Sequence, residues 1–98
     1  MKPCKRIEIV IEQTLERRLA ERLDELGAPG YSVIHGVSGR GDRGLREADE
    51  VTGTFTNCIF LIACNDDAVV TRLVEGVRPI LSRAGGICLV SEALWLRH

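Results

Sequence analysis

Aromatic residues are few in this sequence, and its net charge is close to zero. Of 98 residues, one is tryptophan, one tyrosine and two phenylalanine, and the formal net charge at pH 7 is −1. Single-stranded nucleic acids are usually bound by stacked rings in a positively charged groove, so this composition argues against a nucleic-acid partner. The remainder, with 45% hydrophobic and 28% charged residues, is typical of a globular domain.

Long hydrophobic runs are also missing. A membrane-spanning helix needs about 20 mainly apolar residues, and charged residues interrupt every apolar segment before that length. Residues 1–6 lack the apolar stretch of a signal peptide. We therefore expect a cytoplasmic protein that does not insert into membranes.

The cysteines form no Cys-x-x-Cys pair, and no histidine lies at a metal-ligand spacing from them. Most of them lie in apolar strand patterns, where a free cysteine acts as a small hydrophobic residue. We expect buried thiols rather than a metal site or a disulfide. The cysteines are Cys4, Cys58, Cys64 and Cys88.

Alternating apolar residues predict four strands. The predicted strands cover residues 5–12, 31–38, 56–64 and 87–97. The third strand is apolar on both sides, with Leu61 on one face and Phe60 and Ile62 on the other. A strand of this kind is normally covered on both faces, so we expect the protein to self-associate.

Two further segments carry apolar residues at helical spacing. The first helix is predicted to begin at a Thr14 cap and to end at Gly27. The second is predicted to be capped by Asn65 or Asp66, and Pro79 should kink it or end it early because proline removes a backbone donor.

The predicted order is β-α-β-β-α-β, which is the ferredoxin-like α+β arrangement. Right-handed crossovers then place both helices on one face of a four-stranded antiparallel sheet. We expect a single domain over residues 1–98, with a long loop at about residues 39–55 between the second and third strands.

The start of this loop, Ser38–Arg46, reads SGRGDRGLR and mixes glycines with arginines. Glycines let successive backbone N–H groups point at one anion, and arginine side chains suit phosphate. About two to six residues would suffice to join neighbouring strands, and longer loops are usually functional or unstructured. The pattern therefore favours an anion-binding loop over a solvated loop without a ligand. It is not a Walker A loop, because no Gly-Lys-Ser/Thr follows.

With these motifs the sequence resembles the PII superfamily, and in particular the PII-like branch linked to bicarbonate transport and carboxysomes. The resemblance covers nearly the whole chain. It rests on the element order, on the run Gly30-Tyr31-Ser32-Val33, on the loop with Gly39–Arg46, and on the short glycine turn before the last strand.

The resemblance implies a homotrimer with an adenine-nucleotide site in each cleft between subunits. It assigns the loop base and its arginines to the phosphates, the third strand to the adenine, and the glycine turn and the C-terminal arginine to further phosphate contacts. The nucleotide-binding residues so implied are Ser38, Gly39, Arg40, Gly41, Arg43, Arg46, Phe60, Ile62, Gly85, Gly86, Ile87 and Arg97.

The expected ligands are ADP or AMP, with ATP as a further candidate, and we expect no cofactor or metal. Bicarbonate is a candidate second ligand at Gly39, Arg40 and Gly41, where free N–H groups would lie beside a fixed positive charge. The loop lacks the glutamine that classical PII proteins use with magnesium to bind 2-oxoglutarate, so we expect no binding of that ligand. A bicarbonate transporter or a carboxysome-related protein is the implied protein partner.

Two alternatives stay open from the residues themselves: a small-molecule-binding regulatory module of the same fold, and a small enzyme of unknown substrate. Against catalysis, the histidines are His35 and His98, and neither accompanies a nucleophile. We therefore predict no catalytic residues. We expect His35 to be a structural histidine with a partner and Trp95 to serve packing or an interface.

Overall fold

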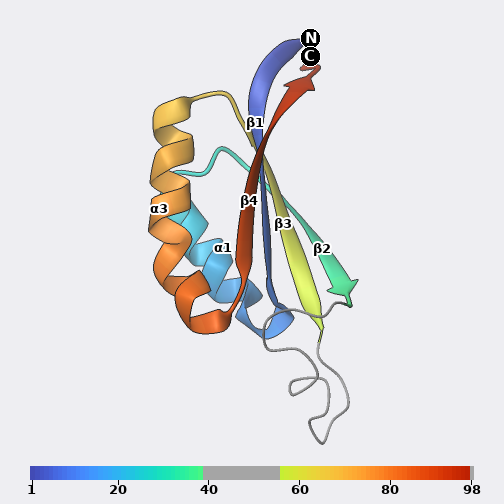
Figure 1. Cartoon of the computed structure of the whole chain (residues 1–98), viewed down its shortest axis with the longest axis vertical. Helices are drawn as coiled ribbons and strands as arrows, with labels where there is room; N and C mark the ends of the chain where they lie inside the picture. The colour runs from blue at the N-terminus through green and yellow to red at the C-terminus, as the bar shows by residue number, and fades with distance from the viewer. Residues whose placement is uncertain (39–55, 98) are drawn as a thin grey trace, which may run out of the picture.

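The computed structural model describes residues 1–38 and 56–97. In these residues the chain forms a four-stranded antiparallel sheet with two α-helices on one of its faces (Figure 1). The predicted ferredoxin-like α+β fold is therefore confirmed, and the strand order across the sheet is β2-β3-β1-β4. The elements are β1 (Lys2–Glu12), the 3-10 turn η1 (Gln13–Leu15), α1 (Glu16–Glu25), β2 (Ser32–Val37), β3 (Asn57–Cys64), α3 (Asp67–Ala84) and β4 (Ile87–Trp95).

The core lies between the helices and the two central strands, β1 and β3. Their antiparallel register sets apolar side chains directly opposite one another on the helix side. The pairs are Ile7 with Ile62, Ile9 with Phe60, and Ile11 with Cys58, and all six side chains are at most 1% exposed. From the helices, Leu19 and Leu23 of α1 and Leu73 and Val77 of α3 complete the core.

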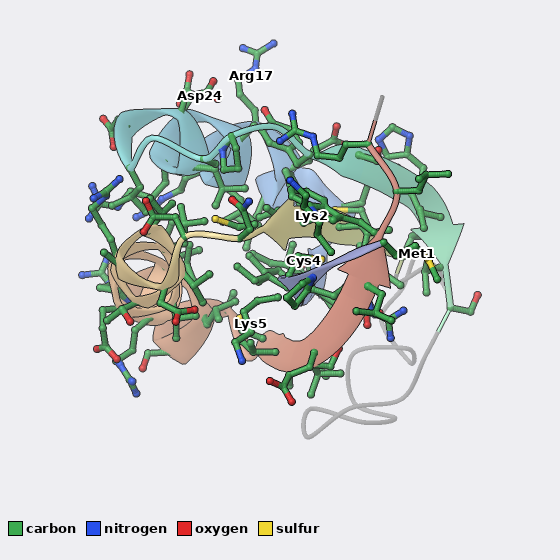
Figure 2. All side chains as sticks on the ribbon, turned by 90° about the horizontal axis from the view of Figure 1, so that it is seen from above. Met1, Lys2, Cys4, Lys5, Arg17 and Asp24 are labelled. Atoms are coloured by element: carbon green, nitrogen blue, oxygen red, sulfur yellow. The ribbon has the colours of Figure 1, made fainter. Side chains whose placement is uncertain are left out.

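The opposite side of the sheet, which we call the open face, is left uncovered by the described residues. Figure 2 shows both helices on one side of the sheet. The open face presents Ile34, Leu61, Ile87 and Leu89, which are 49%, 36%, 51% and 54% exposed. The two-sided apolar character of β3 thus reflects a core side and a second apolar side that the described residues leave uncovered.

Two local expectations about the helices are wrong: the cap at Thr14 and an early end of the second helix at Pro79. Thr14 does not cap the first helix: its hydroxyl contacts Glu12, and the η1 turn precedes α1 instead. Pro79 does not end the second helix, which continues to Ala84 because Ile80, the next residue, is buried against the core. The Asp66 cap is confirmed, since its Oδ1 accepts hydrogen bonds from the backbone N–H groups of Ala68 and Val69.

In the segments that the structure describes, no helix is long and apolar enough to cross a membrane.

Candidate functional site

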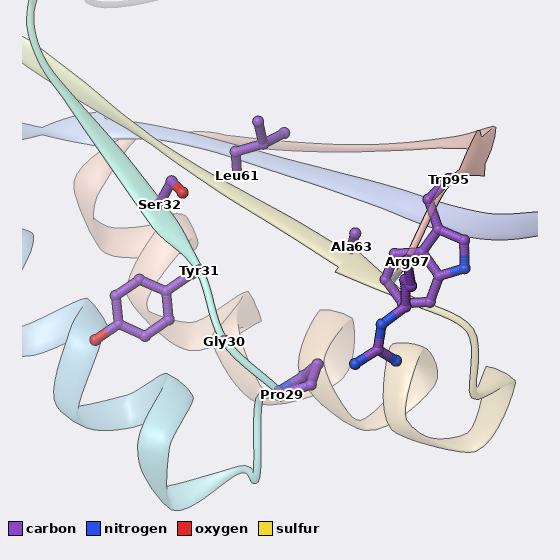
Figure 3. Close-up of a pocket in the computed structure, with 8 residues that line it drawn as sticks. All are labelled: Pro29, Gly30, Tyr31, Ser32, Leu61, Ala63, Trp95 and Arg97. Carbon is purple, nitrogen blue, oxygen red and sulfur yellow. The ribbon is translucent and has the colours of Figure 1, made fainter.

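A pocket of about 350 Å³ lies at one end of the sheet, where the turn before β2 meets the C-terminal segment after β4 (Figure 3). This volume is within the usual range for small-molecule sites. Its lining residues are Pro29, Gly30, Tyr31, Ser32, Leu61, Ala63, Trp95 and Arg97.

The floor of the pocket belongs to the open face. Ser32 is the register partner of Leu61, so both side chains leave the sheet on the same side, and Ala63 follows two residues later on that side. The wall beside them is a backbone turn at Pro29 and Gly30, where Gly30 has φ +151° and no atom lies within 4 Å of the place a Cβ would take. The floor is therefore apolar apart from the Ser32 hydroxyl, and one rim is backbone.

Trp95 and Arg97 form the other wall. The guanidinium carbon of Arg97 lies 4.9 Å from the centroid of the Trp95 ring, a cation–π contact. Figure 3 shows the two side chains next to each other beyond Ala63. The site thus combines a flat aromatic ring and a fixed positive charge over an apolar floor, which suits a ligand with a planar ring and an anionic group.

Tyr31 contributes to this site differently from its neighbours. Its ring turns away from Trp95 and Arg97, as Figure 3 shows, and lies 5.3 Å from the ring of Phe60 in the core. This aromatic contact fixes the start of β2 against β3, and so it holds the turn at Pro29 and Gly30 in place.

The residues predicted to bind nucleotide fall at two different ends of the molecule. One end of the sheet holds the start of β4, with Gly85, Gly86 and Ile87. At the same end, β2 finishes and Ser38 follows it (Figure 1). Arg97 lies beyond the far end of β4, with the pocket. The length of β4, roughly 25 Å at about 3.3 Å per residue, separates these groups. One nucleotide cannot contact both within a single chain.

The backbone itself requires glycine at both positions of the turn before β4. Gly85 adopts the left-handed conformation, with φ +75°, at the C-terminal end of α3. A Cβ on Gly86 would lie 2.7 Å from the carbonyl oxygen of Val10. Both glycines are therefore required by the path of the chain, with or without a ligand.

Phe60 and Ile62 are corrections to the predicted site. Both are 0% exposed in the core under the helices, so neither side chain is available to line a ligand. Because side chains alternate along a strand, their neighbours Leu61 and Ala63 face the pocket instead. The predicted residues Gly39, Arg40, Gly41, Arg43 and Arg46 lie outside the described residues.

Sequence reasoning missed most of the pocket. The sequence predicts the segment from Gly30 to Ser32 only as a family motif, and it predicts a role in packing or an interface for Trp95. The i, i+2 spacing of Trp95 and Arg97 was an available signal, because it can place a ring and a charge on one side of an extended chain. The contact between this segment and the turn before β2 could not be predicted from local patterns, since Gly30 and Trp95 are 65 positions apart in the sequence.

His35 has a partner, as expected, but it is not buried. Its Nε2 lies 2.6 Å from Oε1 of Glu16, and the two side chains are 56% and 33% exposed. Within the described ranges, no cluster of three or more His, Cys, Asp or Glu side chains could hold a metal ion. The four cysteines are free thiols, three of them buried, and burial raises the pKa of Cys58 and of Cys88.

A ferredoxin-like sheet with one open apolar face, and with a ring-and-charge pocket at the end of that face, defines a small α+β protein with a candidate ligand site. The model of the family described as "Nitrogen regulatory protein P-II" matches residues 4–98. The chain belongs to this family, and the resemblance drawn from its sequence is confirmed.

Solved structures with the same fold include ligand complexes. CPII, a PII-like protein from Thiomonas intermedia K12 bound to ADP and bicarbonate, is 25% identical, with a TM-score of 0.76 over 93% of this chain and 86% of that chain. A second CPII structure, bound to ADP, AMP and bicarbonate, is 24% identical, with a TM-score of 0.80 over 98% and 96% of the two chains. The B. subtilis GlnK–ATP complex is 19% identical, with a TM-score of 0.66 over 95% and 84%.

Proposed function

We propose that this protein is a non-catalytic PII-like regulator in the cytoplasm, which binds ADP or AMP and reports the ligand to a protein partner. The observation that carries the proposal is the pocket of Trp95, Arg97 and the β2–β3 floor. Trp95 offers a face on which a purine stacks, and Arg97 offers charge to a phosphate or to the π-face of the base. The complexes of CPII with ADP and AMP support this ligand class.

The site is completed by a second copy of the chain. The pocket floor is part of the open face, and the exposed side chains of Ile34, Ile87 and Leu89 on the same face need cover. We propose a homotrimer in which these faces meet. In such an assembly, Ser38, Gly85, Gly86 and Ile87 of one copy approach the Arg97 end of its neighbour, so that one nucleotide touches both groups that a single chain keeps apart.

The segment from Gly39 to Arg46 carries the reporting function in this proposal. Its glycine N–H groups and arginines are suited to phosphate and, at Gly39 to Gly41, to bicarbonate. The structure of CPII bound to ADP and bicarbonate supports a second anion. Ligand binding would then change the surface that this segment offers to a transporter or a carboxysome-related partner. The protein would in this way signal inorganic-carbon or energy status.

Titration calorimetry with ADP tests the ligand class. We expect the parent protein to bind ADP and AMP without magnesium. Arg97→Ala should raise the dissociation constant about tenfold or more, because a charged hydrogen bond is lost. Trp95→Ala should also weaken binding, whereas Trp95→Phe keeps a ring and should retain most of the affinity.

Arg17→Ala is the matched control, since Arg17 points away from the sheet on the outer side of α1 (Figure 2). It removes the same charge and should leave ADP affinity unchanged. A parent protein that binds no adenine nucleotide refutes the proposed function. If Arg97→Ala and Trp95→Ala bind ADP as the parent does, the nucleotide site lies elsewhere. Repeating the titrations with bicarbonate against chloride, at matched pH and ionic strength, tests the second anion.

A further inference from the structure

The C-terminal half of β2 contains a β-bulge. Ile34 pairs with Ile59 and Val37 pairs with Asn57, so His35 and Gly36 together oppose the single residue Cys58. Gly36 has φ +71°, the left-handed conformation that glycine takes up most easily in such a bulge. A bulge of this kind leaves backbone groups without a ladder partner and turns side chains in a new direction.

Side chains from η1 and from the start of α1 contact the two residues of the bulge. The backbone N–H of Gly36 donates to Oε1 of Gln13 at 2.9 Å, and Nε2 of His35 contacts Oε1 of Glu16 at 2.6 Å. Burial raises the pKa of Cys58, the residue opposite the bulge, and the charge of Glu16 raises it further. We call Gln13 and Glu16 the bulge anchor.

Gln13 also holds the other strand of the hairpin. Its backbone N–H donates to the carbonyl oxygen of Thr56 at 2.9 Å, immediately before β3. One residue is therefore bonded to β2 through its side chain and to the entrance of β3 through its backbone. Since β2 is an edge strand with β3 as its neighbour in the sheet, these bonds add to the few ladder pairs that define its register.

The geometry points to Gln13 and Glu16 as positioning residues of the ligand site, acting through the register of β2. In the present register Ser32 faces the pocket beside Leu61. A slip by one residue would turn Ser32 to the helix side and put Val33 in its place. The anchor opposes that slip, and it also fixes where Ser38 leaves the sheet. This inference rests on the proposed ligand site.

The test combines a local and a functional measurement on the full-length protein. Gln13→Met keeps the size of the side chain and removes the acceptor. We expect the Gly36 amide to exchange with solvent about tenfold faster, and the dissociation constant for ADP to rise about fivefold, as fits the loss of one hydrogen bond. Glu16→Met should also raise the dissociation constant for ADP.

Conservative variants separate positioning from a general loss of stability. Gln13→Glu and Glu16→Gln each keep an accepting oxygen and should restore both readouts to within about twofold of the parent. Asp24→Ala is the control for charge loss, since Asp24 points to solvent from the same helix (Figure 2). Circular dichroism at the titration temperature verifies that each variant is folded.

If the Gly36 amide exchanges at the parent rate in Gln13→Met, the claim that the Gln13 side chain holds the bulge is refuted. Its role in ligand binding is refuted if Gln13→Met and Glu16→Met lower the melting temperature but bind ADP as the parent does. A parent that binds no ADP refutes the proposed function and the ligand half of this inference together. In that case, the exchange rate of the Gly36 amide still tests whether Gln13 and Glu16 hold the bulge.

Discussion

Buried thiols are the residues whose chemistry the fold changes most clearly. Cys58 is fully buried opposite the β2 bulge, and burial, followed by the charge of Glu16, raises its pKa. Cys88 is half-buried on β4, and burial raises its pKa as well. Both thiols stay protonated in the folded protein at pH values where exposed cysteines ionise, which makes them poor nucleophiles.

These shifts predict a loss of stability at alkaline pH. The unfolded chain ionises its thiols at about pH 8.5, whereas the folded chain still holds those protons. The unfolded state therefore binds fewer protons, and the free energy of unfolding falls as pH rises above that value. Urea unfolding of parent and Cys88→Ala between about pH 7.5 and 9.5, under reducing conditions, measures the contribution of Cys88. The stability of the parent relative to the variant should fall with pH; a constant difference would contradict the assignment.

At the scale of elements, the start of α3 depends on one side chain. Asp66 adopts an extended conformation, and its carboxylate accepts from the N–H groups of Ala68 at 3.0 Å and Val69 at 3.3 Å. These donors would otherwise have no partner within the helix. The carboxylate therefore stabilises the first turn of α3.

We predict that Asp66→Ala lowers the free energy of unfolding by about 1 kcal/mol. Asp67→Ala is the matched control, because it removes a carboxylate from the same helix turn and leaves both capping bonds intact. It should cost less, at about 0.3–1 kcal/mol from the helix dipole alone. Urea unfolding at neutral pH measures both variants. Equal losses would show that charge, rather than the capping bonds, matters at this end.

The helix pair is locked by a close approach that a side chain would prevent. A Cβ on Gly76 would lie 2.5 Å from the methyl carbons of Leu26, so α3 carries a glycine where the end of α1 crosses it. Arginines then join the two elements: Arg22 Nε donates to the carbonyl oxygen of Gly76, and Arg72 Nε donates to that of Leu26. The helix layer is thereby fixed as a unit over one face of the sheet.

At the scale of the whole molecule, the helix layer covers one face of the sheet, and no other element of residues 1–38 and 56–97 covers the open face. A homotrimer is the assembly that we propose, and sedimentation equilibrium at micromolar concentration should give three times the 10.8 kDa chain mass. Leu89→Lys should weaken the assembly, since it puts a charge on the open face. Leu89 lies opposite Glu8 on β1, so the new lysine has a partner and the subunit should still fold.

Thr71→Lys is the control for this experiment, since Thr71 is exposed on α3, an element of the helix layer. It should leave the assembly unchanged. A parent protein that sediments as a monomer would refute the trimer, and it would also leave the pocket without the second half that the proposed nucleotide site needs.

Much of the fold could be predicted from local patterns. Alternating isoleucines in β1 and apolar residues at helical spacing in α3 specify their elements because burial of one face dominates their energetics. The Asp66 cap is equally local. Helix ends were harder: Thr14 and Pro79 were misjudged because η1 and the burial of Ile80 depend on tertiary packing rather than on intrinsic preference.

The sequence by itself determined the order of the elements, the two-sided apolar character of β3 and the membership of the P-II family, since each depends on residue types along one short stretch or on their overall order. The tertiary structure decided which face of β3 is core and which is open. It therefore replaced Phe60 and Ile62 by Leu61 and Ala63 at the candidate site. It also brought Trp95 and Arg97 to the turn at Gly30, and Gln13 and Glu16 to the bulge at Gly36. Those contacts join segments far apart along the chain, so they follow from register and crossover geometry, which no local pattern contains.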